Sequence, residues 1–186
     1  MRLFRGRSQK VASRTRRGVT PAQVALAAVL LAGAAGGGQV AAAGVPSHCG
    51  LHSALPDAGC TPGLRNTAVT QTTIQSTICK PGFTRTIRPP VNYTDHLKLQ
   101  LMVSYGLKGQ PSAYELDHFI ALELGGNPTS PANLWPEPYL PTPGAHQKDK
   151  VENYLHAQVC SGAMSLAEAQ RLISTDWTAV LPQLGH

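Results

Sequence analysis

The sequence predicts a small α+β fold in which a β-hairpin is followed by a helix, further helices pack around this unit, and disulfides brace it. Three observations lead to this prediction. Apolar residues flank a Gly125-Gly126 turn as in a hairpin, apolar residues at helical spacing follow it, and four cysteines occur in the same part of the chain. A chain of 186 residues buries one core, so we expect one domain.

Residues 1–43 have the composition of a secretory signal peptide, with an N-terminal anchor as the alternative. Seven basic residues and no acidic residue lie in 1–20, and an apolar stretch follows from about Val24 to Ala35. This stretch is shorter than the roughly 20 residues that a membrane-spanning helix needs. We expect cleavage near Ala43, which gives a secreted or periplasmic protein without stable membrane insertion.

The net charge of +6 belongs to this leader. Seven of the 16 Lys and Arg residues lie there, which leaves nine basic residues against ten acidic ones in the rest of the chain. The basic isoelectric point is therefore no argument for nucleic-acid binding.

The cysteines predict two disulfides, because an even number beyond a signal peptide is typical of an oxidising compartment. We favour Cys79 with Cys160, which ties the middle of the fold to its C-terminal helices, and Cys49 with Cys60 as a local loop. The long, uneven spacings and the lack of a Cys-x-x-Cys pair argue against a zinc site.

Residues 44–67, rich in Gly and Pro, predict an irregular arm, and residues 68–186 form the remaining domain with its C-terminal helices. Residues 70–79 suit a short helix or a strand. Residues 83–88 alternate like a strand that the following prolines end.

The remaining helices have recognisable ends. Thr94 is a typical N-cap for a helix to about Tyr105. A second helix runs from near Pro143 to Cys160, and a last one begins after the capping box of Ser165 with Glu168. We expect that last helix to extend from Leu166 to about Trp177.

The segment between the first two of these helices carries the chemistry. One strand ends in Asp117-His118, a glycine turn follows, and the next strand begins at Asn133. A bend would let Asp117 hold a cation while His118 addresses a substrate held by the same cation. Phosphodiester hydrolysis needs such a pair, because the ion neutralises developing charge and the imidazole takes a proton from water. Asn133 could bond to the backbone and hold the His118 loop.

Residues 114–135 resemble the core of the His-Asn-His (HNH, ββα-metal) endonucleases, in which Asp-His, a Gly-Gly turn and a later Asn-Leu precede a helix with the last metal ligand. Fourteen residues separate His118 from Asn133, within the family's usual spacing. The resemblance implies His118 as general base, Asp117 as metal ligand and Asn133 as the structural organiser of the catalytic site. It also implies one divalent ion, first of all Mg²⁺, with Mn²⁺, Zn²⁺ or Ca²⁺ as options.

The second metal ligand is expected on the helix after the hairpin, and His146 is our first candidate. It follows Asn133 by thirteen residues, a longer gap than the family norm, and four prolines make this stretch an extended loop. The alternative ligands are Asp149, Glu152 and Asn153.

Other residues near the hairpin have simpler interpretations. Lys148 and Lys150 predict a solvated helix face, although either could contact a phosphate. Trp135 is expected in the core, and Glu123 and His156 at the surface.

These patterns predict an exported, metal-dependent nuclease that hydrolyses DNA or RNA. The alternative is a non-catalytic, exported, disulfide-braced binding or scaffold domain that keeps a degenerate HNH hairpin. Geometry discriminates between them, since the nuclease needs a helix side chain that converges with Asp117 on one ion. The sequence makes no prediction of oligomeric state.

Overall fold

The computed structural model describes residues 44–185, and in this range it has α+β architecture. The predicted fold class, hairpin and two disulfides are confirmed. The leader and its cleavage point at Ala43 lie outside the described residues. Between residues 44 and 185, no helix combines the length and the apolar character needed to cross a membrane. The regular elements are α1 (Phe83–Ile87), α2 (Val91–Ser104), β1 (Tyr114–His118), β2 (Leu134–Pro138), α3 (Ala145–Cys160) and α4 (Leu166–Asp176).

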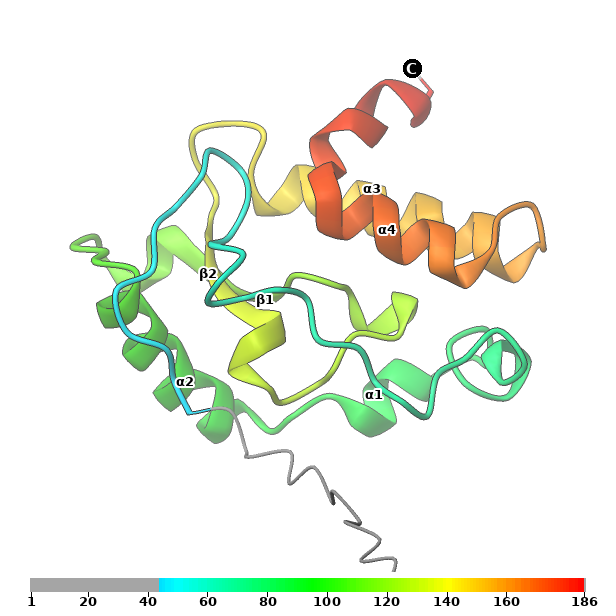
Figure 1. The fold of residues 1–186 in the computed structure, drawn as a ribbon, viewed down its shortest axis with the longest axis horizontal. Coiled ribbons are helices and arrows are strands. Elements are labelled where there is room, and N and C mark those ends of the chain that lie inside the picture. The colour runs from blue at the N-terminus through cyan, green and yellow to red at the C-terminus, as the bar shows by residue number, and fades with distance from the viewer. Residues whose placement is uncertain (1–43, 186) are drawn as a thin grey trace, which may run out of the picture. The chain divides into compact units, whose positions relative to one another are not determined.

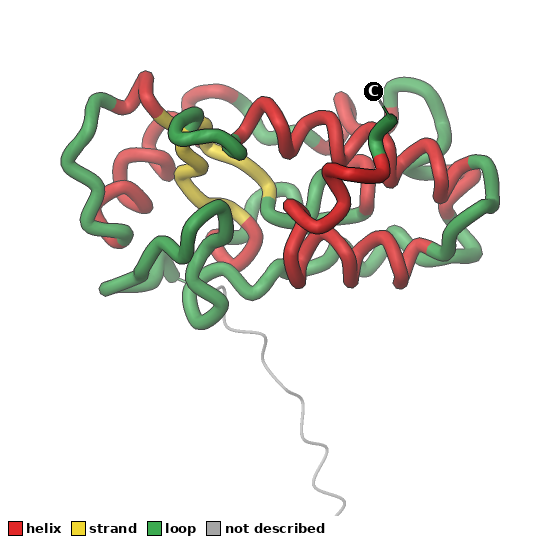
Figure 2. Tube along the Cα trace, turned by 90° about the horizontal axis from the view of Figure 1, so that it is seen from above, coloured by secondary structure: helices red, strands yellow, loops and turns green. Residues whose placement is uncertain are grey.

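The two strands form an antiparallel pair in which Asp117 lies opposite Trp135 and His118 opposite Leu134. Helix α2 contacts the hairpin on one side, and α3, which packs against α4, contacts it on another (Figure 1). Seen at right angles in Figure 2, the short strands lie among helical segments that make up most of the regular structure. The hairpin is therefore fixed by helices rather than by further strands.

The main core lies between the hairpin loop and the inner faces of the last two helices. Trp135 is fully buried there, as predicted. Helix burial follows the expected period, since side chains three and four residues apart face the same side. The core residues of α3 and α4 include Val151, Leu155, Val159, Leu166, Ala169 and Ile173.

The arm before the domain is irregular, as predicted, but it is bonded to the hairpin loop. The amides of Gly63 and Leu64 donate to the Ala132 carbonyl, and the Asn127 amide donates to the Leu64 carbonyl. The hairpin loop in turn requires glycine at position 126, because a Cβ there would lie 1.7 Å from the Ile120 carbonyl oxygen. The arm and the loop therefore pack as one layer.

Three local predictions were wrong or incomplete. Residues 83–88 form helix α1 instead of a strand, since Gly82 supplies the left-handed turn before it and extended Arg88 precedes the prolines. Helix α2 begins at Val91, three residues before the predicted cap. Thr94 lies inside the helix, where its hydroxyl donates to the Val91 carbonyl, so it does not cap the helix. Residues 70–79 form turns around one 3-10 turn, where threonine hydroxyls bond to nearby carbonyls.

The two disulfides have the favoured connectivity. Cys49 pairs with Cys60 over a sequence separation of 11, and Cys79 pairs with Cys160 over a separation of 81. The second bond joins the turns before α1 to the last residue of α3. Such bonds are typical of proteins that fold in an oxidising compartment.

We expect the Cys79–Cys160 bond to contribute more stability than the Cys49–Cys60 bond, because it closes the longer loop. Replacing both Cys79 and Cys160 by Ala should lower the free energy of unfolding by about 4 kcal/mol. Replacing Cys49 and Cys60 should cost about 1–2 kcal/mol less. Urea unfolding of the two double variants measures this, and equal losses would contradict it.

Candidate functional site

His118 lies at the end of β1 with its ring held by a backbone carbonyl. The side chain is buried, and its Nε2 lies 3.0 Å from the Pro128 carbonyl oxygen. A carbonyl only accepts, so Nε2 carries the proton and Nδ1 keeps a lone pair in the neutral ring. Burial lowers the pKa of His118, although the Pro128 carbonyl opposes this effect. The imidazole is therefore neutral and oriented near neutral pH.

Asn133 holds the loop that follows His118. It is fully buried, its Oδ1 accepts from the Ile120 amide at 2.9 Å, and its Nδ2 donates to the Ile120 and Asn127 carbonyls at 3.0 Å each. These are the backbone contacts that the sequence led us to expect. Gly126 packs against the same amide, where a Cβ would lie 2.7 Å from Nδ2. The catalytic role of Asn133 stays a prediction.

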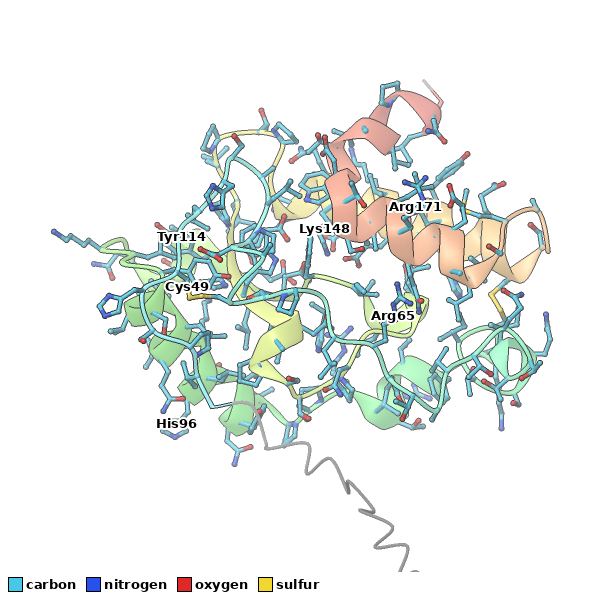
Figure 3. The ribbon with its side chains drawn as sticks, in the orientation of Figure 1. Cys49, Arg65, His96, Tyr114, Lys148 and Arg171 are labelled. Atoms are coloured by element: carbon cyan, nitrogen blue, oxygen red, sulfur yellow. A yellow bond between two sulfur atoms is a disulfide. The ribbon has the colours of Figure 1, made fainter. Side chains whose placement is uncertain are left out.

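Lys148 lies in the interior, which contradicts the prediction of a solvated helix face. Its side chain is 1% exposed, and Figure 3 shows it amid the side chains of the interior, whereas His96 lies at the periphery. Its Nζ donates to Asp117 Oδ2 at 2.6 Å, to the His118 carbonyl at 2.9 Å and to Glu152 Oε1. All three N–H donors of the ammonium are used.

The other candidate ligands on α3 face away from this centre. The His146 side chain is 71% exposed, its ring lies 4.8 Å from that of Tyr139, and its Nδ1 lies 4.0 Å from Asp149 Oδ2. Asp149 and Asn153 are also exposed. Lys150 is exposed, as predicted. The helix therefore presents Lys148 and Glu152 to Asp117, where His146 was expected.

Glu137 is a member of the centre that the sequence did not reveal. It is fully buried, and neither carboxyl oxygen has a hydrogen-bond partner within residues 44–185. Burial, and then the neighbouring Asp117 carboxylate, raise the pKa of Glu137 to about 11, so it is neutral at pH 7. Its place in β2 two residues after buried Trp135 was the available signal.

The remaining carboxyl groups of the centre differ in charge. Burial would raise the pKa of Asp117, but the Lys148 ammonium holds it below its ordinary value. Burial raises the pKa of Glu152 to about 8, against the opposing effect of Lys148. Despite its own burial, the surrounding carboxylates raise the pKa of Lys148. Asp117 and Lys148 therefore form the permanent ion pair.

A cleft of about 310 Å³ opens beside His118. Two basic side chains line it, Arg88 from the end of α1 and Lys98 from α2, and Arg88 is exposed. The Lys98 ammonium donates to the Tyr114 carbonyl at 2.7 Å, which holds it against β1. Tyr139 and two acidic residues, Asp95 and Glu115, also line the cleft. No local pattern in the sequence singles out Arg88 or Lys98.

The predicted divalent ion does not fit between Asp117 and α3. The Lys148 ammonium already bonds to Asp117 Oδ2, to Glu152 Oε1 and to the His118 carbonyl, which are the oxygens that join β1 to α3. A divalent ion that used these three oxygens would have to displace Lys148.

A different cluster could hold a metal ion. In the described part of the chain, Cys79, His156 and Cys160 bring their ligand atoms within 4.8 Å of one another. The two cysteines are joined as a disulfide, so they offer thiolates only after reduction. His156 is half-buried and its Nε2 lies 2.9 Å from the Ile78 carbonyl oxygen, so it is less exposed than predicted. Glu123 is also half-buried, with one carboxyl oxygen fully buried.

We expect Glu137→Gln to stabilise the protein increasingly as the pH rises. When the pKa of an acid is higher in the folded than in the unfolded protein, the free energy of unfolding falls as the pH rises between the two values. For Glu137 these values are near 4.5 in the unfolded protein and about 11 in the folded protein. The amide removes this loss, so the difference from wild type should grow by up to about 1.4 kcal/mol per pH unit between pH 6 and 9. Urea unfolding across this range measures it.

The matched control is Glu168→Gln, because Glu168 is exposed and its hydrogen bond with Arg171 lowers its pKa, so it is ionised throughout this pH range. That change should not alter the slope of stability against pH between pH 6 and 9. Parallel curves for wild type and Glu137→Gln would show that Glu137 is ionised in the folded protein.

No protein-family model matches this chain, and neither a curated protein nor a solved structure matches it.

Proposed function

We propose that this chain is an exported nuclease that hydrolyses phosphodiester bonds of DNA or RNA, with His118 as the general base. One observation carries the proposal. The His118 imidazole donates from Nε2 to the Pro128 carbonyl, keeps a lone pair on Nδ1, and lines a cleft that also bears Arg88 and Lys98. An oriented neutral base beside two cations suits a water attack on a phosphodiester.

The chemistry divides among these residues. Arg88 and Lys98 would attract the phosphate and offset charge that develops on its oxygens. His118 Nδ1 would take a proton from the attacking water as its oxygen bonds to phosphorus, and the resulting imidazolium would stay hydrogen-bonded to the Pro128 carbonyl. The P–O bond to the leaving oxygen breaks in the same step, and that oxygen takes a proton from solvent. Asn133 would keep the loop after His118 in place through its bonds to Ile120. The order of hairpin and then helix α3 supports an HNH-like core.

The proposal of export rests on two features. The leader has the composition of a signal peptide, and the described chain contains two disulfides and no free cysteine.

A non-catalytic binding domain is the second candidate, and one observation favours it. The buried Lys148 satisfies all three of its donors with Asp117, Glu152 and the His118 carbonyl, as a purely structural network would. In that case the hairpin is a scaffold, and the cleft beside His118 binds a ligand without turnover.

We expect His118→Ala to lose about a hundredfold to ten-thousandfold of the hydrolysis rate, because only the base is removed. The assay follows cleavage of plasmid DNA and of RNA by the purified protein, with Mg²⁺, Mn²⁺, Zn²⁺ or Ca²⁺ and with chelator. Asn133→Ala should lower activity and the melting temperature together, because it frees a buried loop.

Two results would decide against this assignment. Wild-type protein that cleaves neither nucleic acid under any of these conditions would favour the binding domain. A folded, fully active His118→Ala variant would remove His118 as the base while leaving hydrolysis itself intact. His96→Ala is the matched control, because His96 is exposed on α2 and should retain activity.

We expect Arg88→Ala to lower kcat/KM about tenfold to a hundredfold, the effect of losing one charge-assisted hydrogen bond to a phosphate. Arg85→Ala is the control, because Arg85 is exposed on the same short helix and does not line the cleft. Steady-state kinetics on an oligonucleotide measure both variants. Equal effects of the two changes would point to general charge attraction.

A further inference from the structure

We propose that the Lys148 ammonium is the resident cation of the Asp117 centre and takes the place of a divalent metal ion, so that this centre neither binds nor needs one. The claim about cation binding stands on the structure of the centre. The claim about hydrolysis without a metal rests in addition on the proposed nuclease function.

The ligand set around Nζ is the one that a hard cation would use. It consists of one oxygen each from the Asp117 and Glu152 carboxyl groups, and the His118 backbone carbonyl. Carboxylate and carbonyl oxygens are the ligands that Ca²⁺, Mg²⁺ and Mn²⁺ prefer. They come from β1 and from α3, the two elements that an ion between hairpin and helix would join. The ammonium therefore occupies a cation site rather than an arbitrary place in the core.

A divalent ion and the Lys148 ammonium would not bind at this site together. The ammonium already bonds to the Asp117, Glu152 and His118 oxygens, so an ion that used the same oxygens would require Lys148 to leave a place where it is 1% exposed. An ion that bound beside Lys148 would place two like charges a few ångströms apart in a low-dielectric interior, which is strongly unfavourable. Lys148 would also lose its partners, and a buried charge without partners is costly.

The ammonium acts on the reaction through another residue. Lys148 bonds to the carbonyl of His118 and to the side chain of the preceding residue, and it does not line the cleft. It is therefore a positioning residue for the base. The charge that offsets the phosphate comes from Arg88 and Lys98 instead, because these side chains line the cleft.

The inference predicts that removing the ammonium uncovers a metal site. We would titrate Mn²⁺ into wild type, Lys148→Ala and Lys150→Ala and follow free Mn²⁺ by electron paramagnetic resonance. Lys148→Ala should gain one site, with affinity at least about tenfold tighter than any site in wild type, and saturating Mn²⁺ should restore part of its lowered melting temperature. Wild type and Lys150→Ala, which changes an exposed residue of the same helix, should bind none at this centre.

A second change locates the new site. Lys148→Ala combined with Asp117→Asn should lose the Mn²⁺ site again. A Lys148→Ala protein that folds but gains no site would overturn the inference. If Lys148→Ala does not fold, wild type still decides, because saturable Mn²⁺ binding that Asp117→Asn abolishes would overturn it and its absence would support it.

Hydrolysis is measured separately. Wild-type cleavage of nucleic acid should change by less than about twofold when excess chelator replaces Mg²⁺, and His118→Ala should be inactive in both conditions. Cleavage that requires Mg²⁺ and is lost in chelator would overturn the metal-free reaction. No cleavage in any condition would refute the proposed function, and the Mn²⁺ titration would still decide whether Lys148 is the resident cation.

Discussion

The burial of one charged side chain, Lys148, constrains the rest of the centre. An ammonium that is 1% exposed must find its hydrogen bonds inside the protein, and it finds them on Asp117, Glu152 and the His118 carbonyl. Breaking such a buried pair from one side typically costs about 3–5 kcal/mol. The end of β1 is therefore fixed to the inner face of α3, and the position of the His118 backbone follows from that contact.

Asn133 fixes the same segment from the other direction. Its amide group bonds to both backbone groups of Ile120, two residues after His118. The His118 ring is held by a third contact, because its Nε2 donates to the Pro128 carbonyl in the hairpin loop. His118 is thus constrained at its carbonyl, at the following loop and at its ring, as expected for a residue whose orientation matters.

The sequence predicted the elements whose signals are local. The glycine turn, the strand ends at His118 and Asn133 and the cap at Ser165 depend on neighbouring residues, and the structure has the hairpin and the last helix where these signals put them. Helix α1 was missed because five residues carry too little periodicity to separate helix from strand. Lys148 lies three residues before buried Val151, so its inward position was readable, but a lysine is normally assigned to solvent. The neutral state of Glu137 depends first on its burial and then on Asp117 in the other strand, and no local sequence pattern contains either.

The identity of the cation beside Asp117 decides which groups could bind the phosphate in the proposed hydrolysis. A divalent ion at Asp117 could bind the phosphate directly, because it has open coordination positions. The Lys148 ammonium has no open coordination position. Because Glu137 is neutral, the Asp117 carboxylate balances the single positive charge of Lys148, and Glu152 adds negative charge only when it ionises. A centre that is nearly neutral and closed exerts little attraction on a substrate. In the proposed reaction, the positive charge beside the phosphate would therefore come from Arg88 and Lys98, which line the cleft next to His118.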